Sequence, residues 1–169
     1  YSGIIGWFKM KYQSIILAAG PPKTDDESFL KCRFPAMNAM SLLEKNQPKG
    51  AIPIFTKILK QEPKNTAALY NKGLALNQIK KYSDALTCFE LLLEINPKDA
   101  AAINNKGIAM AELGNIQGAS ECYDKAIEVD PKYGPSYFNK GVLLDKLQEH
   151  EEALNCFENV HRSNPTHMD

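Results

Sequence analysis

Residue types that could support catalysis are few in this sequence, and their spacing forms none of the familiar reactive sets. The three histidines, His150, His161 and His167, have neither the H-x3-H nor the HExxH spacing of a metal site. The sequence also lacks a glycine-rich phosphate loop and a G-x-S-x-G nucleophile turn. We therefore predict no catalytic residue, no metal and no cofactor, and a chain that is not an enzyme.

Cysteine is the next reactive residue type, and three of the four cysteines share a fixed spacing. Cys32 stands apart, whereas Cys88, Cys122 and Cys156 recur at equal intervals along the chain, and none forms a C-x-x-C pair. A redox or metal ladder and a set of small buried side chains are both compatible with this spacing. Packing is favoured, because equivalent helices of stacked repeats lie about 10 Å apart and a disulfide needs Cα atoms within about 7 Å.

A third set of polar residues has the same spacing. Asn71, Asn105 and Asn139 each begin an Asn-Lys-Gly triplet. Asparagine is a poor helix former, because its side chain competes for backbone hydrogen bonds, so three at one position suggest a use. An amide offers both a donor and an acceptor, and it could grip the backbone of a bound peptide. We interpret the set as a candidate peptide-binding ladder.

The elements that carry these residues repeat with a period of 34. Four series of residue types follow this period without a slip. They are the prolines Pro63, Pro97, Pro131 and Pro165; the alanines Ala51, Ala85, Ala119 and Ala153; the aromatics Phe55, Phe89, Tyr123 and Phe157; and the small residues Ala39, Gly73, Gly107 and Gly141.

Each period is predicted to contain two helices. In residues 66–97, the apolar positions of 66–79 and 85–95 recur at helical spacing, and Asn96-Pro97 ends the second helix. Gly73 is expected to face Ala85 so that the two helices can approach closely. Phe89 is then expected to fill the space where one pair meets the next.

This pattern resembles the tetratricopeptide repeat, whose signature is W-x2-L-G-x2-Y, then A-x3-F, then P. The matching residues in the second period are Leu69, Lys72, Gly73, Leu76, Ala85, Phe89 and Pro97. The tryptophan of the family is absent, and lysine replaces its leucine before the glycine. The resemblance implies an all-α fold, a right-handed superhelical stack of antiparallel helix pairs (an α-solenoid).

We divide the chain into five segments on this basis. Residues 1–31 are a non-repeat segment and linker, 32–65 a degenerate repeat, 66–99 and 100–133 regular repeats, and 134–169 a repeat without a capping helix. Pro48 and Pro53 suggest a strained or shortened second helix in residues 32–65. Residues 1–20 are apolar but interrupted by Lys9 and Lys11, so contact with a membrane is one alternative for this segment.

In the resembled family, the first helix of each pair lines a concave groove, and some relatives that glycosylate proteins hold an extended peptide there with asparagines. The resemblance therefore implies a partner-binding groove made of Tyr70, Asn71, Leu74, Asn77, Asn104, Asn105, Ile108, Phe138, Asn139, Val142 and Asp145. This surface is apolar with amides. It does not match the basic positions with which other relatives bind acidic chaperone tails.

The expected function is non-enzymatic binding of a protein or peptide. Twenty basic residues balance twenty acidic ones, which argues against a nucleic-acid partner. Two alternatives remain, a scaffold subunit of a larger and membrane-associated assembly, and the regulatory part of a longer enzyme. We expect a cytoplasmic location.

The end of the array gives a last expectation. Repeat proteins need capped ends, because each repeat buries its apolar face only against a neighbour. Only four residues follow Pro165, so we expect apolar surface around Tyr137, Leu144 and Val160. We predict that this face is covered by a second copy of the chain, by a partner in a larger assembly, or by a further helix of the protein that lies outside this sequence.

Overall fold

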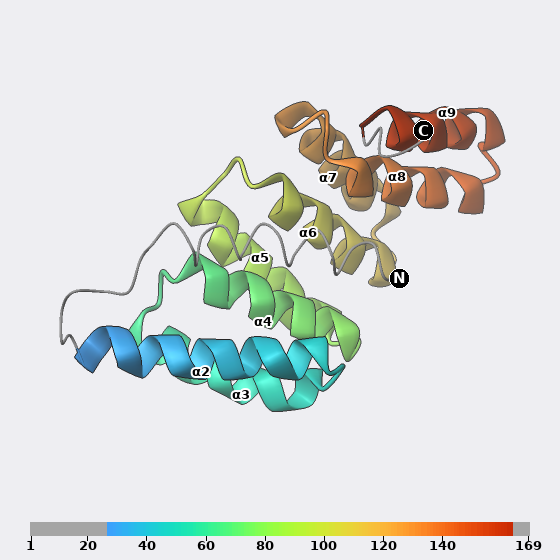
Figure 1. Cartoon of the computed structure of the whole chain (residues 1–169). Helices are drawn as coiled ribbons and strands as arrows, with labels where there is room; N and C mark the ends of the chain where they lie inside the picture. Colours follow the sequence, from blue (N-terminus) through green and yellow to red (C-terminus); the bar gives the residue numbers. More distant parts are fainter. Residues whose placement is uncertain (1–26, 164–169) are drawn as a thin grey trace, which may run out of the picture. The chain divides into compact units, whose positions relative to one another are not determined.

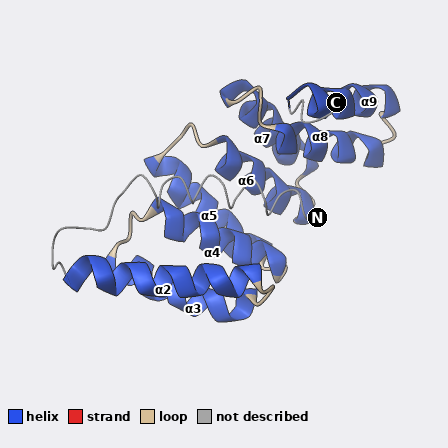
Figure 2. Ribbon diagram, viewed as in Figure 1, coloured by secondary structure: helices blue, strands red, loops and turns tan. Residues whose placement is uncertain are grey.

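The computed structural model describes residues 27–163, and within this range every regular element is an α-helix (Figure 2). The chain divides into two units, Tyr1–Cys32 and Arg33–Asp169, and the following concerns the second. No helix of the described part is long and apolar enough to span a bilayer. Residues 1–20, for which membrane contact is an alternative, lie outside the described residues. The helices are α2 (Glu27–Glu44), α3 (Pro48–Gln61), α4 (Thr66–Gln78), α5 (Tyr82–Ile95), α6 (Ala100–Glu112), α7 (Ile116–Val129), α8 (Gly134–Lys146) and α9 (His150–Ser163).

From α4 onward, the helices form antiparallel pairs that stack in chain order (Figure 1). The pairs are α4–α5, α6–α7 and α8–α9, and the second helix of one pair packs against the first helix of the next. The first helices α4, α6 and α8 have 13 residues each, and the second helices α5, α7 and α9 have 14. The predicted all-α architecture is confirmed. The predicted stop at Asn96 falls at a helix C-cap, and so does Asp130 one period later.

The first helices lie on the inner side of the stack. Helix α6 closely approaches both α4 and α8, whereas the second helices α5, α7 and α9, all fully described, make no such approach to one another. A stack in which one set of helices converges and the other diverges bends toward the converging set. The surface of α4, α6 and α8 that faces away from the second helices is called the inner surface below.

Helix ends are fixed by local hydrogen bonds and by one recurring backbone conformation. The side chains of Asn65 and Asp99 accept hydrogen bonds from the third backbone N–H beyond them and cap α4 and α6. The first helix of each pair is followed by a residue with positive φ. These residues are again one period apart and are Asn46, Lys80, Gly114 and Gln148.

Helix α3 corrects one expectation. It has 14 residues, as many as α5, so Pro48 and Pro53 do not shorten it. Pro48 stands at the start of the helix, where a backbone N–H has no partner within the helix. Pro53 removes the hydrogen bond to the carbonyl of Lys49, a solvent-exposed residue of the first turn.

The core of each pair is a glycine against an aromatic ring. A Cβ atom added to Gly73 would lie 2.7 Å from Cζ of Phe89, and one added to Gly107 would lie 2.7 Å from Cε1 of Tyr123. The three atoms nearest to such a Cβ at Gly73 all belong to Phe89. The principal partner of the glycine is therefore the ring of Phe89. We had expected Ala85 in this place. The ring fills space within its own pair, in addition to any contact with the next.

We predict that Gly107→Leu destabilises the chain, because a side chain at this position displaces the ring of Tyr123. Overpacking costs roughly 1–3 kcal/mol, which outweighs the gain of about 1 kcal/mol from replacing a helical glycine. Urea denaturation followed by circular dichroism measures the change. Ala101→Leu, at a half-exposed position of the same helix, is the control, and equal stability of the two variants would contradict this packing.

Ser136 leads to a prediction of increased stability. Its side chain is fully buried, and Oγ has no hydrogen-bond partner, whereas alanine occupies the equivalent positions 68 and 102. Ser136→Ala should stabilise the chain by about 1 kcal/mol, because it removes an unpaired buried hydroxyl. The reverse exchange, Ala102→Ser, should lower stability by a similar amount. Thermal melting of both variants tests this, and a loss of stability in Ser136→Ala would refute it.

Candidate protein-binding surfaces

All eleven predicted groove residues lie on the inner helices α4, α6 and α8, but their exposure differs. Tyr70, Asn71, Asn104 and Asn105 are buried. The half-buried residues are Leu74, Asn77, Ile108, Asn139 and Val142, and the exposed ones are Phe138 and Asp145. The half-buried and exposed residues of this set are therefore the ones with side-chain surface that a partner could reach.

The asparagines of the candidate ladder make hydrogen bonds within the array. The side-chain amide of Asn105 donates to the hydroxyl of Tyr70 in the preceding repeat at 3.2 Å and to the carbonyl of Ala101 at 2.8 Å. The amide of Asn139 donates to Oδ1 of Asn104 at 2.9 Å. The bonds to Tyr70 and Asn104 each link the first helices of neighbouring repeats. The amides therefore hold successive repeats in register, a role that the sequence alone did not reveal.

Asn71 differs from the other two members of the set. Its amide donates to the carbonyl of Ala67 within the same helix at 2.8 Å. The residue one period before Tyr70 is Ala36, whose side chain cannot accept a hydrogen bond. The inter-repeat bond is thus present where the preceding repeat supplies a polar side chain.

An aliphatic stripe runs along the inner surface. Leu74, Ile108 and Val142 occupy the same position in three successive repeats, and each is half-buried. Each therefore presents part of an aliphatic side chain at the same position of its helix, and a protein partner can bury such apolar surface.

A second set of inter-repeat contacts is ionic, and the sequence analysis missed it. Lys106 Nζ lies 3.2 Å from Glu90 Oε1, and Lys140 pairs in the same way with Asp124. In both pairs, the lysine of the Asn-Lys-Gly triplet reaches the acid that follows the core aromatic of the preceding repeat. The acid and the lysine are separated by the same length of chain in both cases, and this regularity could have indicated the pairs.

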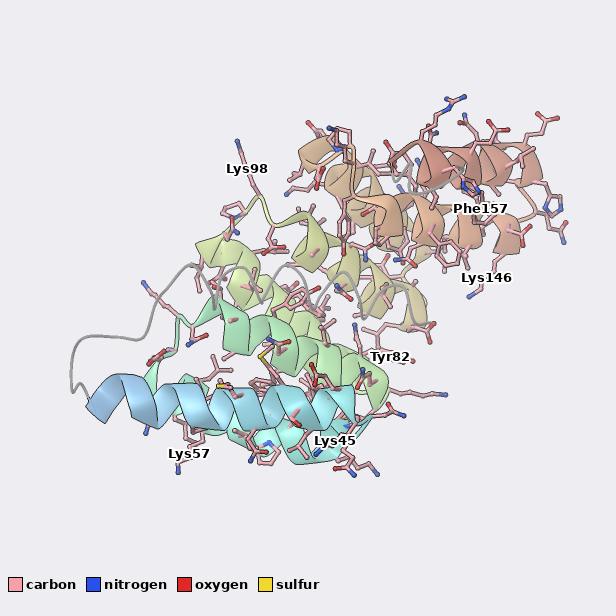
Figure 3. The ribbon with its side chains drawn as sticks, viewed as in Figure 1. Lys45, Lys57, Tyr82, Lys98, Lys146 and Phe157 are labelled. Atoms are coloured by element: carbon pink, nitrogen blue, oxygen red, sulfur yellow. The ribbon has the colours of Figure 1, made fainter. Side chains whose placement is uncertain are left out.

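The last repeat presents an open end, which we call the terminal face (Phe138, Leu154, Phe157, Glu158 and Val160). Phe157 is labelled on α9 in Figure 3. Its ring centroid lies 5.9 Å from that of Phe138, as the ring centroid of Phe89 lies 6.2 Å from that of Tyr70. Tyr70 is only 7% exposed, whereas Phe138 is 52% and Leu154 is 61% exposed. Apolar side chains are therefore exposed at this end.

The residues named from the sequence for this end need a correction. Leu144 is buried, and Tyr137 and Val160 are half-buried. The most exposed apolar side chains here are instead Phe138, Leu147 and Leu154.

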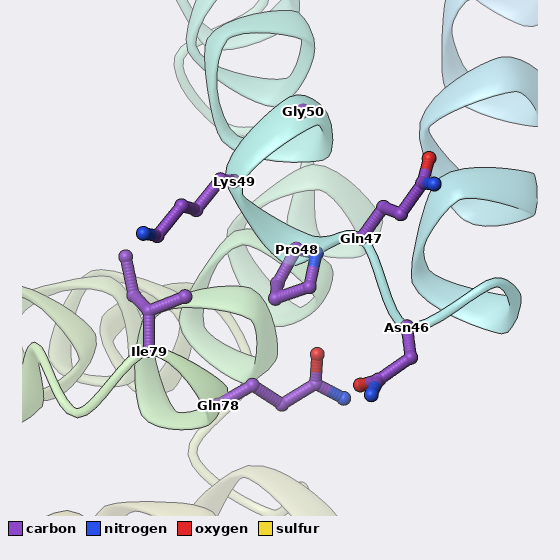
Figure 4. Close-up of a pocket in the computed structure, with 7 residues that line it drawn as sticks. All are labelled: Asn46, Gln47, Pro48, Lys49, Gly50, Gln78 and Ile79. Atoms are coloured by element: carbon purple, nitrogen blue, oxygen red, sulfur yellow. The ribbon is translucent and has the colours of Figure 1, made fainter.

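A cleft of about 440 Å³ lies at the other end of the described array, between the α2–α3 turn and the end of α4 (Figure 4). It is lined by Asn46, Gln47, Pro48, Lys49, Gly50, Gln78 and Ile79. At the next junction Tyr82 occupies the position of Pro48. Lys49 is the only ionisable side chain of the cleft, which gives it no acid–base pair.

The cysteines behave as packing residues. Cys88 is buried, and Cys122 and Cys156 are half-buried, without a disulfide among the three. Burial raises the pKa of all three thiols, so the reactive thiolate is disfavoured at neutral pH. Within the described residues, no group of three potential ligands could hold a metal ion.

The hydrogen bond from Asn105 to Tyr70 leads to a stability prediction. Tyr70→Phe removes the acceptor and should cost about 1 kcal/mol. Phe138→Tyr, at the equivalent position, adds a hydroxyl at an exposed site and should change stability by less than about 0.5 kcal/mol. Urea denaturation measures both. Fully additive effects of Tyr70→Phe and Asn105→Ala would show that the two side chains are not coupled.

Comparisons with known proteins agree with this architecture. Family models described as tetratricopeptide repeat match residues 42–106, 100–133 and 122–155. Together these matches run from residue 42 to residue 155. A comparison of the sequence with curated proteins finds no match.

Solved structures with the same fold are numerous. MamA (residues 41 to the end) from Desulfovibrio magneticus RS-1 is 25% identical, with a TM-score of 0.73 over 82% of this chain and 78% of that one. A thermophilic tetratricopeptide protein of Thermus thermophilus is 19% identical, with a TM-score of 0.73 over 80% of this chain and 75% of that one. The fold class is therefore the all-α, right-handed superhelical stack of helix pairs, and the chain belongs to the tetratricopeptide repeat family.

Proposed function

We propose that this chain is a non-enzymatic module that binds an extended segment of a partner protein along its inner surface. The observation that carries the proposal is the aliphatic stripe of Leu74, Ile108 and Val142, which repeats at one register on three neighbouring inner helices. Such a track suits a partner that runs across successive repeats, since each repeat offers it the same apolar position.

The other predicted groove residues differ in their roles in this proposal. Asn77, Asn139 and Asp145 have exposed surface and flank the stripe, so they contact the partner, whereas Phe138 belongs to the terminal face. Tyr70, Asn71, Asn104 and Asn105 are buried and keep the inner helices in place beneath the stripe. A partner gains affinity from a surface that is already ordered, because less conformational entropy is lost on binding.

The terminal face supports a second proposal. Phe138 and Leu154 are large apolar side chains with more than half of their surface exposed. Exposed apolar surface at the end of a repeat array is a site of protein contact. We infer that a second protein chain covers this face, which corresponds to a scaffold role within an assembly.

Peptides selected from a displayed random library against the immobilised full chain test the first proposal. Leu74→Gln and Val142→Gln should each weaken binding of the selected peptides by about tenfold, as truncation of an apolar contact at an interface costs about 1–2 kcal/mol. Leu91→Gln, at an exposed leucine of α5 outside the inner surface, is the matched control and should leave binding unchanged.

Fluorescence anisotropy of labelled peptides measures these affinities, with circular dichroism to verify that each variant is folded. Peptides whose affinity falls with Leu91→Gln, and not with the two stripe variants, would place binding on the outer helices and remove the proposal.

A further inference from the structure

The two ion pairs between repeats share one register, and this register extends to the end of the array. Glu90 and Asp124 each follow the core aromatic of a second helix, and each receives the lysine of the next first helix. Glu158 stands one period after Asp124, directly after Phe157. It is exposed, and the described residues place no cation within ion-pairing distance of it.

The apolar side chains of the terminal face are likewise exposed where their equivalents are covered. Asn104 is 2% exposed, because α8 covers it and the amide of Asn139 binds it. The equivalent Phe138 is the exposed phenyl ring of the terminal face. Leu154 likewise corresponds to Leu86 and Ser120, which are half-buried where the next first helix packs. A helix packed on α9 as α6 packs on α5 would cover all three side chains.

We propose that the terminal face binds an amphipathic helix of a partner protein, which carries a lysine in the register of Lys106 and Lys140. This proposal rests on the covering partner inferred above and specifies its chemistry. The partner helix lies against α9 as α6 lies against α5. It places the lysine on Glu158 and apolar residues on Leu154 and Phe138.

The described helices of a second copy do not supply this lysine. The lysine-bearing helices α4, α6 and α8 are each packed between two second helices of their own array. Helix α2 carries the exposed Asn38 at the position of the lysine, which gives Glu158 no cation. The proposed occupant is accordingly a helix of a partner protein with a lysine at this position.

The junction between α3 and α4 separates the contribution of apolar contact from that of the ion pair. Thr56 replaces the acid opposite Lys72 there, and Thr56 Oγ1 bonds its own helix at Ile52, yet the helices still pack. Apolar contact is thus sufficient to hold two helices together. The lysine adds orientation and discrimination against helices with an acid at this position.

The probe is a synthetic peptide with the sequence of Ala100–Glu112, the helix that packs on α5. A lactam bridge from a lysine at position 108 to Glu112 keeps it helical, and a fluorophore at its N-terminus reports binding to the full chain by anisotropy. Peptides with Lys106 unchanged or replaced by glutamate are titrated against wild type, Glu158→Lys and Leu154→Gln. Glu128→Lys, at an exposed acid of α7, controls for overall charge.

We expect the lysine peptide to bind wild type and Glu128→Lys with similar affinity, and Glu158→Lys about tenfold more weakly, because like charges then meet. The glutamate peptide should bind Glu158→Lys more tightly than it binds wild type, because exchanging the two charges restores the ion pair. Leu154→Gln should weaken both peptides.

Binding that depends on Leu154 but is indifferent to both charge changes would keep the docking face and overturn the lysine register. No binding of either peptide to any variant would overturn the proposal as a whole, since a face already covered by this chain or by a second copy gives that result. Neither outcome affects the inner-surface proposal, which the stripe variants test separately.

Discussion

The close approach of a glycine to an aromatic ring is the contact on which the rest of this array depends. Gly73, Gly107 and Gly141 each lie where a Cβ atom would be 2.7 Å from the ring of their own pair. Without a side chain at these positions the two helices can pack closely, and the ring fills the space between them. Because all three pairs share this spacing, they stack at one register, and positions one period apart occupy the same environment.

Because positions one period apart are equivalent, the polar contacts between repeats recur as well. Asn105 and Asn139 bind the first helix of the preceding repeat, and Lys106 and Lys140 bind its second helix. Each incoming helix is thus attached to both helices of the pair before it. In the part of the chain that the structure describes, these contacts between repeats are not made at the ends. Ala36 and Thr56 replace the acceptors at one end, and no described lysine pairs with Glu158 at the other. The ends differ from the middle in their chemistry as well as in their exposure.

Much of the fold could be predicted from the sequence, because a period of 34 in proline, alanine, aromatic and small residues determines the helix pairs and their order. The exposure of the candidate surface is harder to predict. Residue type places Asn71 and Asn105 on the inner helices, but whether an amide faces a partner or a neighbouring helix depends on the curvature of the stack. Leu144 and Leu154 show the same difficulty, since both are leucines of the last repeat and only the helix pair around them decides which is buried. Pro53 was misjudged because its lost hydrogen bond falls in an exposed first turn.

Equivalent positions should differ in exposure at the last repeat if its face is open to a partner helix. Hydroxyl-radical footprinting of the full chain, read by mass spectrometry, compares Phe138 with Tyr70 and Leu154 with Leu86 in one experiment. We expect rapid oxidation of Phe138 and Leu154, and slow oxidation of Tyr70 and Leu86, in the chain alone. Protection of Phe138 and Leu154 to the level of Tyr70 and Leu86 in the isolated chain would contradict this expectation, because the terminal face would then already be covered.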